Sequence, residues 1–303
     1  MYKEAVMEKR SVVIIGCGIA GMTAGIYLKR AGIDTLIISD NAPGGVLNNI
    51  PSIENYPGYE KISGPDLAMN IYNQVKSIDI PVLFKGITSI DMDKRIINDS
   101  ILYDYLIIAT GRKGNVLGLD NEKELIGKGV SLCALCDGFF YKDKEVIVVG
   151  GGNTALTEAL YLSSLCKKVT IVYRRDSFTS FKYLIDRVNN TKNIDVLFNS
   201  TLTSYNIDDK KMLKSVCIND KEITTDGVFL AIGSTPNGEL FDVNKENGYI
   251  VVDSKYNTSV NNVYAIGDVI KKDIYQLVTA SYDAVEASYD IIRKESEKLD
   301  NYE

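Results

Sequence analysis

Two cysteines separated by two residues, Cys133 and Cys136, are the side chains of this 303-residue chain best suited to chemistry. A thiolate at one position has a resolving partner at the other, so the pair can open and close a disulfide. Asp137 follows directly and is a candidate donor of the proton that a departing thiolate needs. A structural disulfide and half of a zinc site are the alternatives. A four-ligand zinc centre normally needs a second pair, and the other cysteines are scattered in a chain without histidine, so no metal site is predicted.

A glycine motif near the N-terminus stands between an apolar strand over residues 11–15 and a helix over residues 22–30. The motif has the G-x-G-x-x-G spacing, at Gly16, Gly18 and Gly21. Its glycines allow a tight turn, a close approach of pyrophosphate to the backbone, and close packing of the helix. A second strand over residues 35–39 ends at Asp40, where an acid can bind a ribose hydroxyl. The order predicts a dinucleotide site, and glycines that serve helix packing alone are the alternative.

A second glycine motif, of the form G-x-G-x-x-A, repeats this order in the middle of the chain. Residues 145–149 form the expected first strand, residues 156–164 the helix and residues 168–173 the second strand. The second strand ends in two arginines, where an NAD site usually has a carboxylate. Planar guanidinium groups suit a 2′-phosphate, which favours NADPH over NADH, and a solvated basic pair is the alternative. The candidate contacts are Gly150, Gly152, Asn153, Thr154, Arg174 and Arg175.

Near the C-terminus, residues 263–268 read as a strand that delivers Asp268 at its end. An acid at a strand terminus can accept hydrogen bonds from the hydroxyls of a ribityl chain. The helical stretch that begins at about Gln276 has an N-terminus that can face the electron-rich edge of a flavin. These residues are therefore candidates for a flavin site.

Five blocks of the chain, in order, resemble the low-molecular-weight bacterial thioredoxin reductases, members of the FAD-dependent pyridine nucleotide-disulfide oxidoreductases. The blocks are residues 16–21, 43–45 with 54–58, 109–111, 133–138 followed by 150–155, and 265–269. The resemblance implies a homodimeric flavoprotein oxidoreductase that passes electrons from NADPH through FAD and a Cys133–Cys136 disulfide to thioredoxin. It also implies that the nucleotide domain rotates, because the dithiol cannot face both the flavin and thioredoxin at once.

The resemblance assigns roles to individual residues. It implies that Cys133 is the more exposed sulfur that attacks thioredoxin and that Cys136 lies nearer the flavin. The flavin contacts that it implies beyond the first glycine motif and Asp40 are Gly44, Gly45, Asn55, Thr110, Gly111, Gly267, Asp268 and Gln276.

Several residues depart from the family pattern. Tyr173 and Thr179 stand where the NADPH block of the family usually has a histidine and an arginine. Losing one charge-assisted contact to a phosphate costs about 1.5–3 kcal/mol, which is one to two decades of affinity. Val46, Tyr275 and Tyr282 also depart from the pattern, near the expected flavin and docking surfaces. These changes bear on the electron donor and on the partner rather than on the fold.

Two other functions stay open at this point. One is a flavin disulfide reductase that uses NADH or a reduced one-electron carrier such as ferredoxin and acts on another small redox protein. The second glycine motif and the two arginines argue against the ferredoxin-dependent form of this alternative. The other is a flavin-binding redox sensor, in which the cysteine pair reports its state to a partner with negligible turnover.

The order of the blocks predicts an α/β fold with two Rossmann-like, three-layer dinucleotide-binding domains, the NADPH domain being inserted in a discontinuous FAD domain. We expect the FAD-binding domain over residues 1–112 and 246–303, and the NAD(P)H-binding domain with its redox-active cysteines over residues 113–245. The expected crossover segments contain glycine and polar residues that suit loops.

The composition agrees with a soluble enzyme, and the lack of a membrane-spanning run and of a signal peptide then predicts that it is cytoplasmic. A net charge of −6 and a pI near 5.0 leave no basic surface for nucleic acid. No apolar run approaches the ~18–20 residues that a membrane span needs, and residues 1–10 are too charged for a signal peptide. In the cytoplasm, cysteines rest as thiols unless a reaction turns them over.

Overall fold

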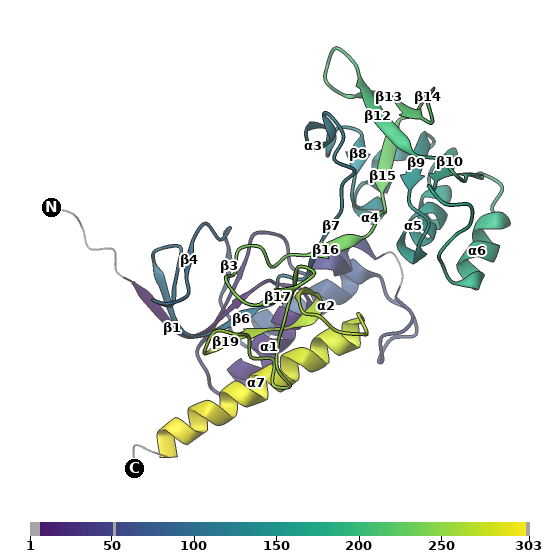
Figure 1. Ribbon diagram of the computed structural model, residues 1–303. Helices are drawn as coiled ribbons and strands as arrows, with labels where there is room; N and C mark the ends of the chain where they lie inside the picture. Colours follow the sequence, from purple (N-terminus) through teal and green to yellow (C-terminus); the bar gives the residue numbers. More distant parts are fainter. Residues whose placement is uncertain (1–6, 51–52, 301–303) are drawn as a thin grey trace. The chain divides into compact units, whose positions relative to one another are not determined.

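The computed structural model describes residues 7–50 and 53–300, and the chain divides into two units (Figure 1). Unit 1 consists of Met1–Lys113 and Pro236–Glu303, and unit 2 consists of Gly114–Thr235. The two crossover points fall within the short strands β7 (Arg112–Gly114) and β16 (Ser234–Pro236). Unit 2 is therefore inserted in unit 1, and the predicted α/β fold with one unit inserted in a discontinuous other is confirmed.

Unit 1 is built on a seven-stranded sheet with β1 (Glu8–Ile15) at its centre. β1 pairs in parallel with β2 and β6, β2 pairs in parallel with β3, and β6 pairs in parallel with β19. β5 and β4 add an antiparallel edge. The bounds are β2 (Thr35–Ser39), β3 (Val82–Phe84), β4 (Ile90–Asp91), β5 (Ile96–Ile97), β6 (Ile101–Ile108) and β19 (Val263–Ala265).

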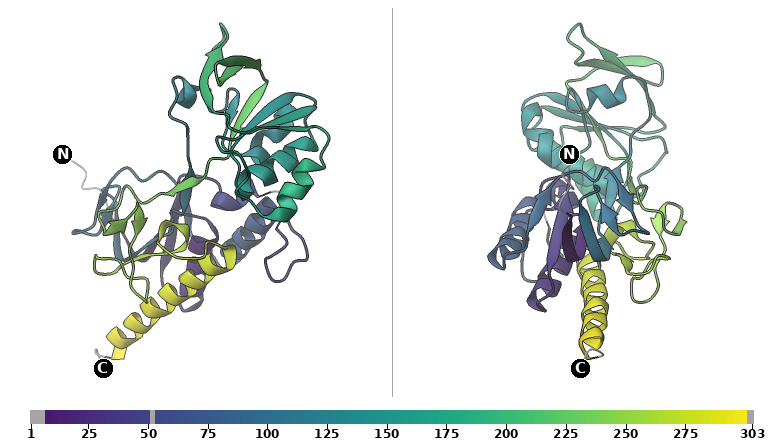
Figure 2. Two further views of the ribbon diagram at one scale, coloured as in Figure 1. Left: turned by 45° about the vertical axis from the view of Figure 1, so that its right-hand side comes forward. Right: turned by 90° about the vertical axis from the view of Figure 1, so that its left-hand side faces the viewer.

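Three helices cover one face of this sheet. α1 (Ile19–Arg30) packs against both α2 (Gly64–Ser77) and α7 (Leu277–Asp300), and Figure 2 shows the long α7 running beside the sheet. Val12 and Ile14 of β1 belong to the core under the helices, whereas Val13 and Ile15 belong to the core on the opposite face. Successive side chains of a strand point to opposite faces, so one apolar run supplies both cores.

The opposite face of the unit 1 sheet is covered mainly by short elements from the C-terminal part of the chain. Their buried residues include Phe241, Ile250 and Val269. The remaining elements of unit 1 are η1 (Gly45–Asn49), β17 (Lys245–Glu246), β18 (Tyr249–Ile250) and η3 (Gly267–Val269).

Unit 2 has a five-stranded parallel sheet in the order β11-β10-β9-β15-β8. α5 (Asn153–Ser163) and α6 (Lys182–Asn189) share a core with one face, and a three-stranded antiparallel sheet shares a core with the other. The bounds are α3 (Glu122–Leu125), β8 (Val130–Ser131), α4 (Ala134–Asp137), η2 (Gly138–Tyr141), β9 (Glu145–Val149), β10 (Lys168–Val172), β11 (Ile194–Leu197), β12 (Leu202–Ile207), β13 (Leu213–Ile218), β14 (Lys221–Thr224) and β15 (Gly227–Leu230).

Both motif helices begin earlier than the sequence predicts. α1 begins at Ile19 rather than at residue 22, and α5 begins at Asn153 rather than at residue 156. In each case the second glycine of the motif is the N-cap, so the rest of the motif forms the first helical turn. In residues 7–50 and 53–300, no helix has both the length and the hydropathy that crossing a membrane requires.

Candidate functional site

The first glycine motif turns the chain from β1 into α1, and two of its glycines are required by packing. Gly16 has a φ of +116°, and a Cβ there would lie 2.2 Å from the carbonyl oxygen of Ala109. A Cβ on Gly21 would lie 1.9 Å from the carbonyl oxygen of Gly16. Both approaches involve backbone atoms that cannot move aside, so these two glycines position the helix against the sheet.

Gly18 is different, because packing within the protein does not require a glycine there. Its φ of −81° suits any residue, and an added Cβ would find no atom nearer than the Gly44 carbonyl oxygen at 3.9 Å. This residue is the N-cap of α1, which has no side-chain cap and no acid in its first turn. Open space beside uncapped N–H groups fits an anionic pyrophosphate. The alternative in which the glycines serve packing alone therefore does not explain Gly18.

The loop after β2 lies against this turn. The Gly44 N–H donates a hydrogen bond of 2.8 Å to the Cys17 carbonyl oxygen, and Gly44 forms a parallel bridge with Gly18. Gly44 and Gly45 both have positive φ, at +113° and +54°. The structure thus brings two of the predicted flavin contacts next to the motif. Asp40 is exposed and directly follows β2, the strand beside β1.

The strands β6 and β19 deliver further predicted residues to the same edge of the sheet, because they are parallel neighbours. Thr110 and Gly111 follow β6, and the Thr110 hydroxyl donates a hydrogen bond of 2.6 Å to the Asn237 carbonyl oxygen. Gly267 follows β19, and a Cβ there would lie 3.0 Å from the Ala20 Cβ in the first turn of α1. Residues from both ends of the chain therefore meet at one helix N-terminus.

Asp268 is half-buried in the short η3 helix at this edge. Burial raises the pKa of its carboxyl, while the charges of Lys272 and Arg112 act in the opposite direction. Lys272 lies 3.9 Å from Asp268 but 2.7 Å from the buried carboxylate of Asp283. Asp283 also accepts a hydrogen bond of 3.0 Å from the Gly267 N–H. Asp283 and Lys272 thereby hold the turn that carries Asp268.

Two predicted flavin contacts from distant blocks touch each other. The side-chain amide of Asn55 donates a hydrogen bond of 3.2 Å to the Oε1 of Gln276. Both residues are exposed. The structure therefore joins the second block of the sequence to the start of α7.

The departures from the family pattern near this site have distinct environments. Val46 and Tyr282 expose 52 % and 58 % of their surface, respectively. Tyr275 is half-buried, and the guanidinium carbon of Arg112 lies 5.0 Å from the centre of its ring and 5.6 Å from that of Tyr249. No role was predicted for Arg112 from the sequence, although its place directly after Gly111 was a signal.

The second glycine motif repeats the geometry of the first in unit 2. Gly150 has a φ of +142°, and a Cβ there would lie 2.3 Å from the Ala231 carbonyl oxygen. Gly152 has a φ of −94°, and an added Cβ would find the Thr179 carbonyl oxygen at 3.8 Å and nothing nearer. α5 also begins with no side-chain cap and no acid in its first turn. This turn fits a second pyrophosphate.

Asn153 and Thr154, two predicted nucleotide contacts of the second motif, differ in the hydrogen bonds that their side chains already make. The Oδ1 of Asn153 accepts hydrogen bonds from the Ser180 hydroxyl at 2.8 Å and from the Phe181 N–H at 2.9 Å. Asn153 therefore fixes the loop before α6 onto the glycine turn. Thr154 is exposed.

The arginine pair lies at the end of β10, and both Arg174 and Arg175 are exposed. The two departures in this block bond to each other, since 2.9 Å separates the Tyr173 hydroxyl from the Thr179 hydroxyl. The Thr179 N–H also donates a hydrogen bond of 2.9 Å to the Gly151 carbonyl oxygen. The loop therefore lies against the glycine turn, with two cations available to a phosphate.

Cys133 is disulfide-bonded and only 9 % exposed, directly before α4. The side chain of Cys136 lies outside the described residues. Burial raises the pKa of Cys17 to about 12 and that of Cys166 to about 11, so both thiols are poor nucleophiles. Asp137 ends α4, is half-buried, and its N–H donates a hydrogen bond of 3.1 Å to the Cys133 carbonyl oxygen.

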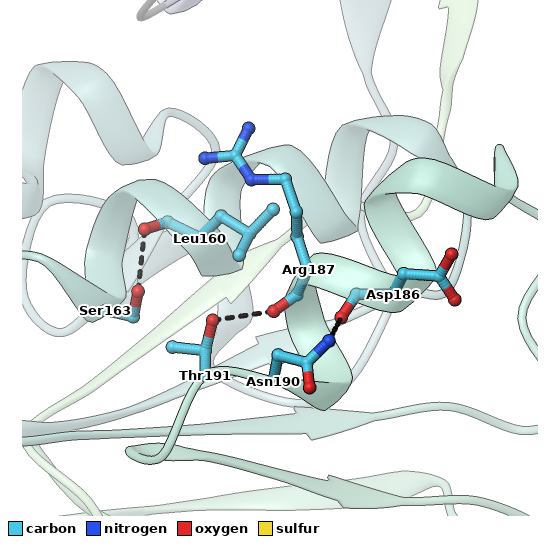
Figure 3. A pocket seen from close by; sticks show the side chains of 6 residues that line it. All are labelled: Leu160, Ser163, Asp186, Arg187, Asn190 and Thr191. Carbon is cyan, nitrogen blue, oxygen red and sulfur yellow. Dashed lines mark hydrogen bonds between the residues drawn. The ribbon is translucent and has the colours of Figure 1, made fainter.

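No metal cluster competes with these sites in the described part of the chain. Residues 7–50 and 53–300 contain no group of three or more histidine, cysteine or acidic residues placed to hold a metal ion. A shallow hollow between α5 and α6 contains none of the predicted site residues (Figure 3). Its Ser163, Asn190 and Thr191 side chains bond to carbonyl oxygens of their own helical turns.

Comparisons with known proteins agree with this arrangement. Residues 10–284 match the model of a family described as pyridine nucleotide-disulphide oxidoreductase. A thioredoxin reductase of Bacillus subtilis is 38 % identical over 285 residues, which cover 90 % of each chain. A thioredoxin reductase of Buchnera aphidicola is 39 % identical over 306 residues, covering 94 % of each chain. The crystal structure of Lactococcus lactis thioredoxin reductase has a TM-score of 0.86 and 34 % identity, covering 94 % of this chain and 99 % of that one.

Replacing Gly18 by alanine should weaken FAD binding without weakening the fold. The new Cβ fits the protein but occupies space that a pyrophosphate needs, so we expect a Kd for FAD at least about tenfold higher. The free energy of unfolding of the apoprotein should change by less than about 0.5 kcal/mol. Titration of the apoprotein with FAD by fluorescence quenching, together with urea unfolding, measures both quantities.

Gly86→Ala is the matched control, because a Cβ there would meet no atom within 4 Å. FAD affinity should be unchanged in this variant. Equal FAD affinity in Gly18→Ala and in the wild type would contradict a ligand at the first glycine turn.

Proposed function

This chain belongs to the pyridine nucleotide-disulphide oxidoreductase family, and we propose that it reduces thioredoxin with electrons that pass from NADPH through FAD to a Cys133–Cys136 disulfide. One observation supports this function above all others. Each unit has a glycine turn whose second glycine is open to a ligand, and unit 2 also carries the disulfide-bonded Cys133. Two dinucleotides and one redox disulfide are the parts that the reaction needs. The relatives reported above are named thioredoxin reductases, which favours this function over a ferredoxin-dependent reductase or a redox sensor.

Unit 1 corresponds to the proposed FAD-binding domain, which the sequence predicts over residues 1–112 and 246–303. Its turn at Gly18 would receive the pyrophosphate, Asp40 would bind a ribose hydroxyl, and Asp268 would accept hydrogen bonds from the ribityl chain. The Asn55–Gln276 contact would close the site at the start of α7. The other proposed contacts are Gly16, Gly21, Gly44, Gly45, Thr110, Gly111 and Gly267.

Unit 2 corresponds to the proposed NADPH-binding domain, which the sequence predicts over residues 113–245. The turn from Gly150 to Thr154 would hold the pyrophosphate, and Arg174 and Arg175 would bind the 2′-phosphate. Asn153 would support the turn, because its side chain is already bonded to residues 180–181.

FAD, when bound, supplies hydride acceptance from NADPH and the delivery of two electrons to a disulfide. In the reduced protein, the Cys133 thiolate would attack the disulfide of thioredoxin and form a mixed disulfide. Cys136 would then attack Cys133 and release reduced thioredoxin, while Asp137 would donate the proton to the departing thiolate. The buried Cys17 and Cys166 cannot replace the pair, because the protonated thiol dominates at neutral pH.

We also propose that the protein works in the cytoplasm as a homodimer. One side of α7 carries a repeat of apolar and aromatic residues at spacings of four, three and four, which is typical of a helix that packs against another helix. The residues are Val278, Tyr282, Val285 and Tyr289. Tyr282 and Tyr289 expose 58 % and 59 % of their surface. A second copy of the chain would cover these rings.

Tyr282→Glu should weaken the dimer, because a buried unpaired carboxylate costs several kcal/mol. We expect a dimer in the wild type and mostly monomer in the variant at micromolar concentration, measured by sedimentation velocity. Tyr183→Glu, at a ring of unit 2 that is 61 % exposed, is the control. A wild-type protein that sediments as a monomer would refute the homodimer.

Cys133→Ser should abolish thioredoxin reduction but leave the anaerobic reduction of FAD by NADPH intact, because only the attacking sulfur is lost. Insulin reduction coupled through thioredoxin measures the first activity, and bleaching of the flavin absorbance measures the second. Cys217→Ser is the control, since Cys217 is a free thiol in the same unit. Full thioredoxin reduction by a Cys133→Ser protein would show that Cys133 is not the attacking sulfur.

Arg175→Ala should raise the KM for NADPH by about 10–100-fold, the equivalent of about 1.5–3 kcal/mol for one charge-assisted contact, and leave the KM for NADH unchanged. Steady-state kinetics with each nucleotide provide the measurement. Arg187→Ala, at another exposed arginine of unit 2, should change neither value. Parallel losses with both nucleotides would contradict a 2′-phosphate contact.

A further inference from the structure

Glu158 of α5 is a carboxyl that the reaction described above does not use and that the interior of unit 2 encloses. Its surface is only 5 % exposed, and the rest of the buried face of α5 is apolar, with Ala155, Leu156, Ala159 and Leu162. Its carboxyl accepts a hydrogen bond from the Ala134 N–H. Its Oε2 has no hydrogen-bond partner among the described residues. A buried polar atom left unpaired is rare and calls for an explanation.

This environment makes a charge on Glu158 costly. Burial raises the pKa of the carboxyl to about 7, and the hydrogen bond from the Ala134 N–H acts in the opposite direction. An ionised carboxylate with a single backbone donor does not recover the free energy lost on leaving water. Because the pKa lies near neutrality, a small change in nearby charge decides whether Glu158 holds a proton.

No charged side chain contributes to this raised pKa. α4, α6, β9, β10 and β11 pack against α5. All the charged residues of these five elements are half-buried or exposed: Asp137, Glu145, Lys168, Lys182, Asp186, Arg187 and Asp195. A new charge close to the Glu158 carboxyl would therefore be the main charge that acts on its pKa.

Reduction of the disulfide creates such a charge. The Ala134 N–H that donates a hydrogen bond to Glu158 belongs to the peptide bond between Cys133 and Ala134. Ala134 is the first residue of α4. Cys133 is disulfide-bonded in this structure, so the pKa near 7 is that of the oxidised state. A thiolate formed on reduction would place a negative charge near the carboxylate and favour its protonation.

We propose that Glu158 is a positioning residue that takes up a proton when the Cys133–Cys136 disulfide is reduced. This inference rests on the proposed function, which supplies the two electrons. Reduction breaks the S–S bond, one sulfur takes a proton, the other remains a thiolate, and the Glu158 carboxylate takes a second proton from solvent. The loss of its negative charge stabilises the thiolate and so keeps a nucleophile ready on the reduced protein.

The pH dependence of the disulfide equilibrium tests this proposal. The FAD-loaded protein is equilibrated in thiol and disulfide buffers, and the reduced fraction is read by alkylation and mass spectrometry. Just above pH 7, reduction of the wild-type disulfide should take up one more proton than reduction of the Glu158→Gln disulfide. The equilibrium constant for reduction should therefore fall about tenfold more per pH unit in the wild type than in the variant. Below pH 7 the two slopes should agree, since Glu158 is protonated in both redox states.

Glu122→Gln is the matched control in the same unit. Glu122 is 1 % exposed, but its carboxylate accepts hydrogen bonds from the Leu117 and Gly118 N–H groups and from the Tyr205 hydroxyl. Its replacement should lower stability without changing the slope. Equal slopes in the wild type and Glu158→Gln would overturn the proposal, and so would the same change of slope in Glu122→Gln.

A second measurement decides the matter if Glu158→Gln fails to fold. Infrared difference spectra of the wild type at about pH 8, with glutamate carboxyls labelled by carbon-13, compare the reduced and oxidised states. A labelled carboxylic-acid band that appears on reduction supports the proposal, and its absence overturns it. Neither measurement uses NADPH or thioredoxin, so a failure of the proposed function would be seen separately, as absent turnover.

Discussion

The close approach of a helix to the end of a buried parallel strand, which glycine alone permits, is the constraint on which both units depend. In unit 1, Gly21 lets α1 lie against the carbonyl oxygen of Gly16, and in unit 2, Gly150 lets the chain pass the carbonyl oxygen of Ala231. These approaches fix a helix N-terminus at the carboxyl edge of each sheet. The second glycine of each motif, Gly18 or Gly152, is then left open at that edge, where packing makes no use of it.

The polar groups of the two units differ in burial and in neighbouring charge, and these differences determine their chemistry. Cys17 lies inside the first motif, yet burial keeps its thiol protonated, whereas Cys133 is held in a disulfide on unit 2. Asp268 stays next to two cations on a turn that Asp283 fixes. One constraint on the backbone thus leads to sites that differ in chemistry, because the side chains delivered to each edge differ.

The sequence predicted what local patterns determine. Apolar runs and glycine spacing predicted both strand-turn-helix units, and the insertion of one in the other followed from the order of the blocks. It did not predict that Arg112 stacks on Tyr275, or that Glu158 reaches the backbone next to Cys133, because both contacts join segments that only the tertiary fold brings together. The helix starts were also missed, since the residues that follow each capping glycine were counted as part of the turn. The roles of individual residues and the domain limits stay predictions.

An anaerobic titration of the FAD-loaded protein with NADPH follows the electrons from the nucleotide to the flavin and on to the disulfide. We expect loss of the flavin absorbance and the appearance of two new thiols per chain, at Cys133 and Cys136 by mass spectrometry. A flavin that dithionite reduces but NADPH does not, or a bleached flavin without new thiols at these positions, would contradict this electron path.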